Sequence, residues 1–200
     1  MKILVVLGHP DKESFNHAIA RTVVSTLRGN NHEVIFHDLY SEQFEPLLYK
    51  AEIPKDASLP PIIEQHCTEV SAAEGIVIIH PNWWGQPPAI LKGWIDRALR
   101  PGTAYEFAEG DRGEGIPNGL LRAQAALVFT TSNTPRKREG TIFGDPLETL
   151  WKECIFGLCG VNRFYRRNFE VIVTSTEKQR RQWLREVEEV TARYFPQVTS

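Results

Sequence analysis

The chain has 200 residues, of which 42% are hydrophobic, and its formal net charge is −2. This length suits one domain with a sizeable core and is short for two domains. A charge balance this close to neutral would not draw the protein onto nucleic acid or an anionic membrane. Three cysteines without zinc-site spacing favour a reducing compartment, where we expect buried free thiols at Cys67, Cys154 and Cys159. We therefore expect a cytoplasmic protein, folded as one domain over residues 1–200, without nucleic-acid partner or membrane insertion.

The first apolar run, residues 3–7, is β-branched and short, which predicts a buried strand. A polar loop follows it, and Ser14 or Asn16 can cap a helix that continues to Gly29. A helix that starts just after a strand offers unpaired N–H groups and positive dipole potential to an anion. The loop before this helix is therefore a predicted phosphate site.

Residues 33–37 predict a second strand. Pro61 suits the first turn of a following helix. The apolar face expected for that helix carries Ile62, Ile63, His66, Cys67, Val70 and Ala73.

The stretch from residue 76 to residue 99 combines a strand, a Trp-rich turn and a helix. Residues 76–79 are all aliphatic, as in a strand buried on both faces. The turn after His80 holds Asn82, Trp83, Trp84, Gly85 and Gln86. Two stripes with a spacing of four residues then predict an amphipathic helix with Ile90, Trp94, Ala98, Leu91, Ile95 and Leu99 facing the core.

The second half of the chain alternates in the same way. Residues 100–121 show no periodicity and form a long loop, which is typical of functional or mobile segments. Residues 123–131 and 164–174 predict two further strands, and the basic run at residues 136–138 is typical of a solvated face. Two helices complete the pattern, one over residues 145–158 and one that starts at Thr176 with a capping box; their expected core residues are Leu147, Leu150, Trp151, Cys154, Ile155, Leu158, Trp183, Val187, Val190 and Tyr194.

Strands and helices that alternate in this way predict an α/β protein with a five-stranded parallel sheet covered on both faces. The expected strand order is 2-1-3-4-5, whose topological switch point lies between the first and third strands. The loops at residues 9–16 and 81–86 meet there, and the loop at residues 132–138 lies alongside. Ligands of open α/β sheets bind in that crevice.

The motifs that the sequence lacks and those that it contains limit the chemistry expected in the crevice. No G-x-G-x-x-G, P-loop or G-x-S-x-G motif occurs, so Rossmann dinucleotide binding, P-loop hydrolysis and α/β-hydrolase chemistry are not indicated. The start of the first helix can bind a phosphate, and the turn with Trp83 and Trp84 can bind an aromatic ring system. Together they favour a flat aromatic ligand that carries a phosphate tail. A flavin meets both demands and supplies redox chemistry itself.

The segment HPNWWGQPPAILKGWIDRALRPGTAY resembles the hallmark of the flavodoxin-like NAD(P)H:quinone oxidoreductases of the DT-diaphorase type, and GHPDKESFNHAIA is similar to the first loop of that family. The family also includes flavoprotein ancillary subunits of potassium-efflux systems. The resemblance implies a flavodoxin-like three-layer sandwich and a homodimeric enzyme that takes a hydride from NAD(P)H and reduces a quinone or similar acceptor by two electrons. It also implies the flavin-binding residues His9, Ser14, Phe15, Asn16, Pro81, Asn82, Trp83, Trp84, Gly85, Thr130, Thr131, Ser132 and Asn133, and no metal.

Several alternatives stay open at this point. The segment 102–105 resembles the FAD-using branch, so FAD is expected with FMN as the alternative. The Tyr and His that aid hydride transfer in the mammalian-type pattern are missing, since Phe143 stands where that His would be, and no catalytic side chain is assigned. A regulatory flavoprotein bound to a membrane transporter is a second possible role, and a flavodoxin-type electron carrier is a third.

Overall fold

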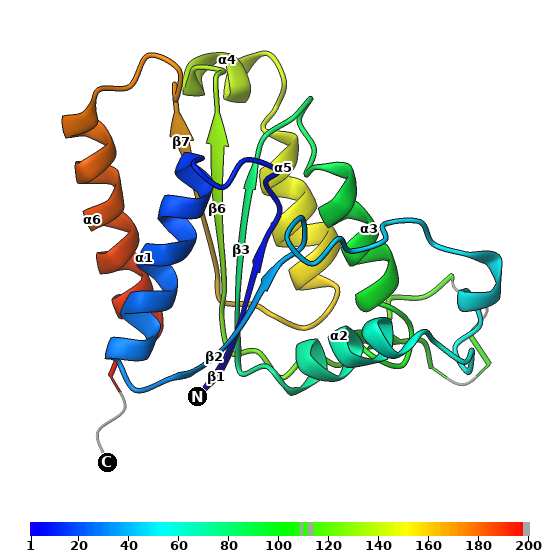
Figure 1. Cartoon of the computed structure of the whole chain (residues 1–200). Helices are drawn as coiled ribbons and strands as arrows, with labels where there is room; N and C mark the ends of the chain where they lie inside the picture. Colours follow the sequence, from blue (N-terminus) through cyan, green and yellow to red (C-terminus); the bar gives the residue numbers. More distant parts are fainter. Residues whose placement is uncertain (109, 112–113, 198–200) are drawn as a thin grey trace.

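Five parallel strands form the central sheet of the computed structural model, which describes residues 1–108, 110–111 and 114–197. Their order is β2-β1-β3-β6-β7 (Figure 1), which confirms the predicted order 2-1-3-4-5. The fourth strand starts three residues later than predicted, and the fifth ends four residues earlier. The strands are β1 (Lys2–Leu7), β2 (Glu33–Asp38), β3 (Gly75–Pro81), β6 (Ala126–Ser132) and β7 (Phe164–Glu170).

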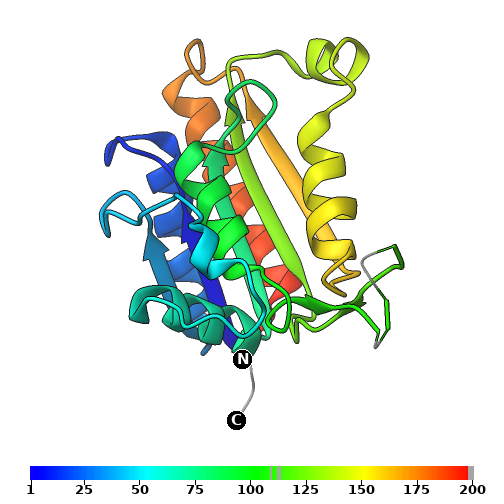
Figure 2. The same ribbon diagram turned by 90° about the vertical axis from the view of Figure 1, so that its right-hand side faces the viewer.

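Helices cover both faces of this sheet, as the alternation of the elements predicts (Figures 1 and 2). On one face, α1 (Phe15–Gly29) packs beside α6 (Glu177–Tyr194). The other face is covered by α2 (Pro61–Ala72), α3 (Ala89–Ala98) and the segment formed by α5 (Pro146–Thr149) and η2 (Leu150–Gly157). The fold is therefore the three-layer sandwich expected from the sequence.

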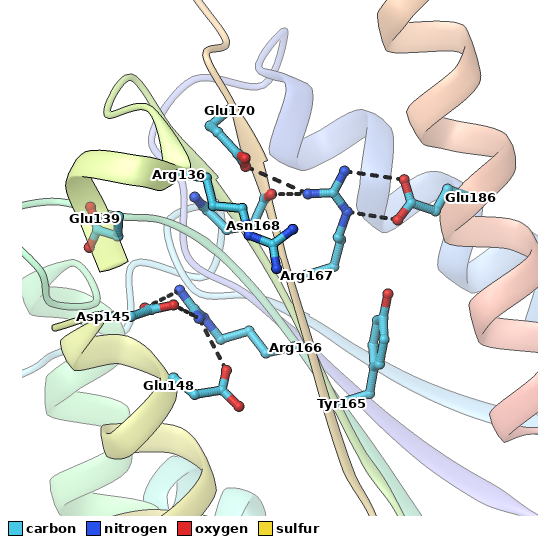
Figure 3. A pocket seen from close by; sticks show the side chains of 10 residues that line it. All are labelled: Arg136, Glu139, Asp145, Glu148, Tyr165, Arg166, Arg167, Asn168, Glu170 and Glu186. Carbon is cyan, nitrogen blue, oxygen red and sulfur yellow. Dashed lines mark hydrogen bonds and ion pairs between the residues drawn. The ribbon is translucent and has the colours of Figure 1, made fainter. Parts of the chain in front are cut away.

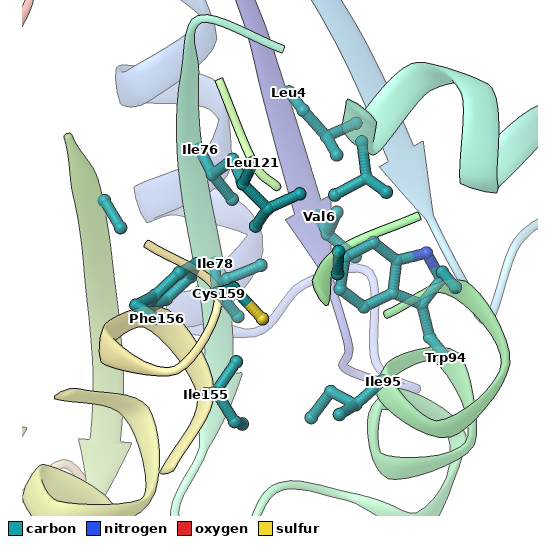
Figure 4. Packing of buried hydrophobic residues seen from close by; sticks show 14 of the residues in the cluster. Leu4, Val6, Ile76, Ile78, Trp94, Ile95, Leu121, Ile155, Phe156 and Cys159 are labelled. Carbon is teal, nitrogen blue, oxygen red and sulfur yellow. The ribbon is translucent and has the colours of Figure 1, made fainter. Parts of the chain in front are cut away.

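The core consists of two apolar clusters, one on each face of the sheet. Every residue of β3 and β6 is buried, because central strands of a parallel sheet are covered on both sides. Figure 4 shows one cluster, to which α3 contributes Trp94, η2 contributes Phe156 and β3 contributes Ile78. The indole N–H of Trp94 is satisfied by His66 Nδ1 at 3.2 Å, so this large ring is buried without an unpaired donor.

The last helix begins with the capping box that the sequence predicts. Thr176 Oγ1 accepts from the backbone N–H of Gln179 at 3.2 Å, and the Gln179 side chain accepts from the backbone N–H of Thr176 at 3.0 Å.

We expect Thr176→Ala to lower the free energy of unfolding by about 1 kcal/mol, because one N–H at the helix start loses its acceptor. Urea denaturation of both proteins measures this difference. Thr68, an exposed threonine inside α2, serves as the control; a Thr68→Ala change of equal size would contradict the capping role.

The helix predicted over residues 145–158 differs from the observed structure. Asp145 lies outside it with φ +46°, α5 is four residues long, and η2 is a π-helix. Because π-helical bonding runs from residue i to i+5, it rotates later side chains away from the α-helical stripe. The prediction that Cys154 is buried was therefore wrong; this thiol is exposed, and Leu158 is partly so. On α2, Ile62 is also exposed rather than part of the core face.

The structure adds short elements that the sequence analysis did not predict. A 3₁₀ turn, η1 (Lys50–Glu52), lies in the connection before α2, and α4 (Arg136–Thr141) follows β6. Within the predicted loop 100–121, β4 (Tyr105–Glu106) and β5 (Asn118–Gly119) form a small antiparallel pair, while positions 109 and 112–113 lie outside the described residues. None of the helices in the described ranges combines the length and hydropathy that a bilayer crossing requires.

A buried histidine joins the end of β2 to α2. His37 Nδ1 lies 2.9 Å from Glu42 Oε1, and His37 Nε2 lies 2.6 Å from Glu69 Oε2. Burial alone lowers the pKa of His37, but the hydrogen bonds to both carboxylates outweigh it and raise the pKa above its ordinary value.

This raised pKa predicts a pH-dependent contribution to stability. It is fully present below the unfolded pKa of about 6.5 and is lost as the pH rises through the folded pKa of His37. We expect Glu69→Gln to cost about 1 kcal/mol at pH 5.5 and less at pH 9, measured by urea unfolding at both pH values. Glu64→Gln, an exposed change on the same helix, is the control. An equal cost at both pH values would contradict the role of His37.

Candidate functional site

A cavity of about 420 Å³ lies at the carboxyl ends of β1, β3 and β6, where the order of the strands reverses. We call it the switch-point cavity. The loops after these three strands form its walls, and the loop after β7 closes one side. Its lining residues are His9, Asp11, Glu13, Ser14, Phe15, Asn16, Pro81, Asn82, Trp83, Thr131, Ser132, Asn133, Thr134, Ile172 and Arg180.

The start of α1 forms one wall of the switch-point cavity. Ser14 is the N-cap residue, with extended backbone and its side chain accepting from the backbone N–H of His17 at 3.3 Å. The next two backbone N–H groups, of Phe15 and Asn16, have no acceptor among the described residues. Free N–H groups and the positive end of the helix dipole make this wall suitable for a phosphate.

Asn16 contributes an unsatisfied polar atom to the same wall. Its side chain is 2% exposed and donates from Nδ2 to Thr131 Oγ1 at 2.8 Å. Its Oδ1 has no partner within the described structure. Buried polar atoms are rarely left without a partner, so an acceptor in this position fits a ligand that carries a hydrogen-bond donor.

The turn after β3 forms the opposite wall and is stabilised by Asn82. This residue donates from its backbone N–H to the Thr131 carbonyl at 2.7 Å, and its Oδ1 accepts from the Gly85 N–H at 2.9 Å. Its Nδ2 donates to Glu139 Oε1 at 2.9 Å, which links the turn to α4. Trp84 and Gly85 both have positive φ values in this turn, and the Trp84 side chain is fully exposed.

The third wall is the loop after β6. Ser132 Oγ accepts from the Thr134 N–H at 2.8 Å, and Asn133 Oδ1 accepts from the Val173 N–H at 3.0 Å. The second bond ties this loop to the loop after β7. There, Arg180 donates to the Ile172 carbonyl and to Ser175 Oγ, which orients its guanidinium at the cavity.

The structure brings most of the predicted site residues together. Exceptions are Trp84, Gly85 and Thr130, which do not line the cavity; Thr130 is buried and donates to Asn168 Oδ1 at 2.9 Å. Arg180 and Ile172 also line the cavity, although neither was predicted as a site residue. The predicted strand order could have indicated these two residues, because the fifth strand also ends at this edge of the sheet. The loop after that strand and the start of α6 therefore reach the same crevice.

Two histidines near the site differ in environment. His9 lines the cavity; burial lowers its pKa, and its Nδ1 lies 3.1 Å from the backbone N of Asp11. His80 is fully buried, its pKa is lowered to about 4 mainly by burial, and its Nε2 accepts from Trp151 Nε1 at 3.0 Å. His80 is therefore structural, and within the described part of the chain neither histidine forms an acid–base pair with another cavity residue.

A second hollow, of about 570 Å³, lies beside β7 and is rich in charge (Figure 3). Its charges largely pair with one another. Arg166 binds Asp145 and Glu148, and Arg167 binds Glu186 through Nε at 2.7 Å. Paired charges leave less potential for an ionic ligand, so this hollow is a weaker candidate than the switch-point cavity.

Comparison with known proteins agrees with this architecture. A family model described as a flavodoxin-like fold matches residues 1–191. An uncharacterized NAD(P)H oxidoreductase of Haemophilus influenzae is 32% identical over 170 residues, which cover 80% of this chain and 79% of that protein. NAD(P)H dehydrogenase [quinone] 1 of Rattus norvegicus is 33% identical over 126 residues. These residues make up 54% of this chain and 46% of the rat enzyme.

Among solved structures, Smu.1420 from Streptococcus mutans UA159 superimposes with a TM-score of 0.82 at 29% identity. The superposition covers 96% of this chain and all of that one. The chain belongs to the flavodoxin-like fold family and, within it, to the NAD(P)H:quinone oxidoreductases.

Proposed function

We propose that the protein takes electrons from NAD(P)H and reduces quinones or similar small acceptors by two-electron transfer, through a flavin held in the switch-point cavity. The observation that carries this proposal is the start of α1, where the free N–H groups of Phe15 and Asn16 face a cavity at the switch point of the sheet. The relatives named above support the same reaction class.

The residues of the cavity fit a flavin. Ser14, Phe15 and Asn16 would hold its phosphate side, because the start of α1 offers donors and positive dipole potential. The turn from Pro81 to Trp83 would flank its ring, and the unsatisfied Oδ1 of Asn16 is an acceptor for a ligand donor. A bound flavin supplies the hydride chemistry, which the side chains of this cavity do not provide.

FAD is the flavin we propose, with FMN as the alternative. Among the described residues that line the cavity, Arg180 is the one lysine or arginine, and it comes from α6 rather than α1. Two separate groups that attract anions, the start of α1 and Arg180, suit a diphosphate better than a single phosphate.

A homodimer in the cytoplasm is part of the proposal. Trp84, Ile142 and Phe143 expose large apolar surfaces, and the turn that carries Trp84 contacts Pro146 through Gly85. Large apolar side chains left exposed to this extent on neighbouring loops are the surface that we expect a second copy of the chain to cover. Sedimentation equilibrium tests the dimer; a monomer at micromolar concentration would contradict it.

The function is tested on the purified protein. We expect a yellow protein that oxidises NADH or NADPH when a soluble quinone is present, and mass spectrometry of the released cofactor distinguishes FAD from FMN. A colourless protein that gains no colour with either flavin would overturn the proposal. A flavin-loaded protein with negligible quinone turnover that co-purifies with a membrane transporter would indicate the regulatory role instead.

A further inference from the structure

A line of hydrogen-bonding contacts runs from the switch-point cavity through α1 to the end of β2. Ser14 Oγ lies 3.0 Å from His17 Nδ1, and His17 Nε2 lies 3.1 Å from Asp38 Oδ2. Ser14 lines the cavity, whereas His17 is 8% exposed and lies behind it. The Ser14 hydroxyl therefore links His17 to a ligand at the start of α1.

Asp38 determines which nitrogen of His17 carries the proton. Burial alone raises the pKa of Asp38, but hydrogen bonds from Ser41 and His17 outweigh it and lower the pKa, so this carboxyl is ionised. Because a carboxylate only accepts, His17 donates from Nε2. Neutral His17 then has a bare Nδ1, which accepts the hydroxyl proton of Ser14. In this state Ser14 offers the cavity a lone pair, not a donor.

Protonation of His17 reverses the bond. Nδ1 then carries a proton and donates it to Ser14 Oγ, so the hydroxyl proton of Ser14 is free to turn toward a ligand oxygen. We propose that His17 is a proton-linked positioning residue, which takes up a proton when a flavin phosphate binds at the start of α1 and so converts Ser14 from acceptor to donor. The proposal rests on the proposed flavin site.

The charged groups around His17 either favour or oppose its protonated form. Asp38 on β2 favours the protonated ring, while His9, whose ring centroid is 6.3 Å away, opposes it when charged. Arg21, which shares a surface hollow with His17 one turn along α1, also opposes it. A bound phosphate adds negative charge beside this line of contacts and so favours the protonated ring as well. Flavin affinity is therefore expected to fall as the pH rises, because binding would consume a proton.

Proton uptake is measured directly by calorimetry. FAD is titrated into flavin-depleted protein at pH 7.5 in two buffers with different protonation enthalpies; FAD is the probe because a phosphate monoester titrates itself near pH 6. We expect net uptake, up to one proton for each FAD, and a dissociation constant that rises by up to about tenfold per pH unit. Riboflavin, which lacks the phosphate, is expected to bind without uptake.

Two variants assign the proton to His17. His17→Gln is expected to bind FAD with no uptake and a flat pH profile, and its thermal melting shows whether it is folded. Asp38→Asn keeps the imidazole but removes the charge that favours its protonation, so the fall in affinity is expected at lower pH. Persistent uptake in His17→Gln would locate the proton elsewhere, at His9 for example, and would overturn the inference.

The two proposals fail in different ways. Wild-type protein that binds FAD without proton uptake overturns the role of His17 and leaves the flavin site intact. Wild-type protein that binds neither FAD nor riboflavin overturns the proposed function, and the inference with it.

Discussion

Ser14→Asp is expected to weaken flavin binding by about 100- to 1000-fold without destabilising the protein. The new carboxylate would stand beside the ligand phosphate, and two like charges about 4 Å apart repel by about 4 kcal/mol at an effective dielectric constant of 20. Aspartate is as good an N-cap as serine and interacts well with the positive end of the helix dipole, so α1 keeps its start. Fluorescence titration with FAD measures the loss.

The control for this variant is Ser25→Asp. Ser25 lies on the same helix, is exposed and does not line the switch-point cavity, so the change adds the same charge away from the ligand. We expect its FAD affinity to stay within about twofold of the wild type, because salt screens exposed charges beyond about 10 Å. Equal FAD affinity for Ser14→Asp and wild type would place the phosphate elsewhere.

Glu52→Gln is expected to lower the free energy of unfolding by about 3 kcal/mol. Its carboxylate binds Arg97 on α3 through two hydrogen bonds, from Nε at 2.8 Å and from Nη2 at 2.7 Å, and both side chains are nearly inaccessible to solvent. Arg97 also donates to the Glu45 backbone carbonyl. Glu52→Gln leaves the buried guanidinium of Arg97 without a compensating charge. The free energy of this uncompensated charge exceeds the net stabilisation that the intact ion pair provides.

A neighbouring ion pair on α3 is the control for Glu52→Gln. Lys92 and Asp96 are paired at 2.6 Å, but both are substantially exposed to solvent. We expect Asp96→Asn to change the free energy of unfolding by less than about 0.5 kcal/mol. Urea denaturation of the three proteins gives both differences. A loss below 1 kcal/mol for Glu52→Gln would show that water or a rearranged Arg97 replaces the lost carboxylate.

The fold could be predicted from the sequence because its strands carry their own signal. Continuous aliphatic runs such as residues 76–79 occur where a strand is covered on both faces, and each run is followed by a helical pattern. The turn after β3 and the start of α1 could be placed at one crevice because strand order follows from that alternation. The N-cap of α1 could be narrowed to Ser14 or Asn16 because capping depends on neighbours in the chain, and the structure shows that it is Ser14.

The features that the sequence did not reveal depend on distant residues. Arg97 looks like a charged residue on an outer face, and only the folding of the connection that carries Glu52 onto α3 makes it a buried ion pair. The π-helical hydrogen bonding that exposes Cys154 has no local pattern in the chain. Trp84 was expected to line the flavin ring because it lies on the switch-point turn; in the structure it has a positive φ, is fully exposed and does not line the cavity.

Phe195, near the end of the chain, helps to cover one face of the central sheet. Its side chain is fully buried, contacts the region of Ile3 and Gly75, and its carbonyl accepts from Asn30 Nδ2 at 2.9 Å. Ribosomes make α1 and β1 long before α6, so the part of this face that α6 and Phe195 cover stays open until they emerge. The nascent chain therefore exposes an apolar surface for most of its synthesis, and that surface is the natural target for a chaperone that holds unfinished chains.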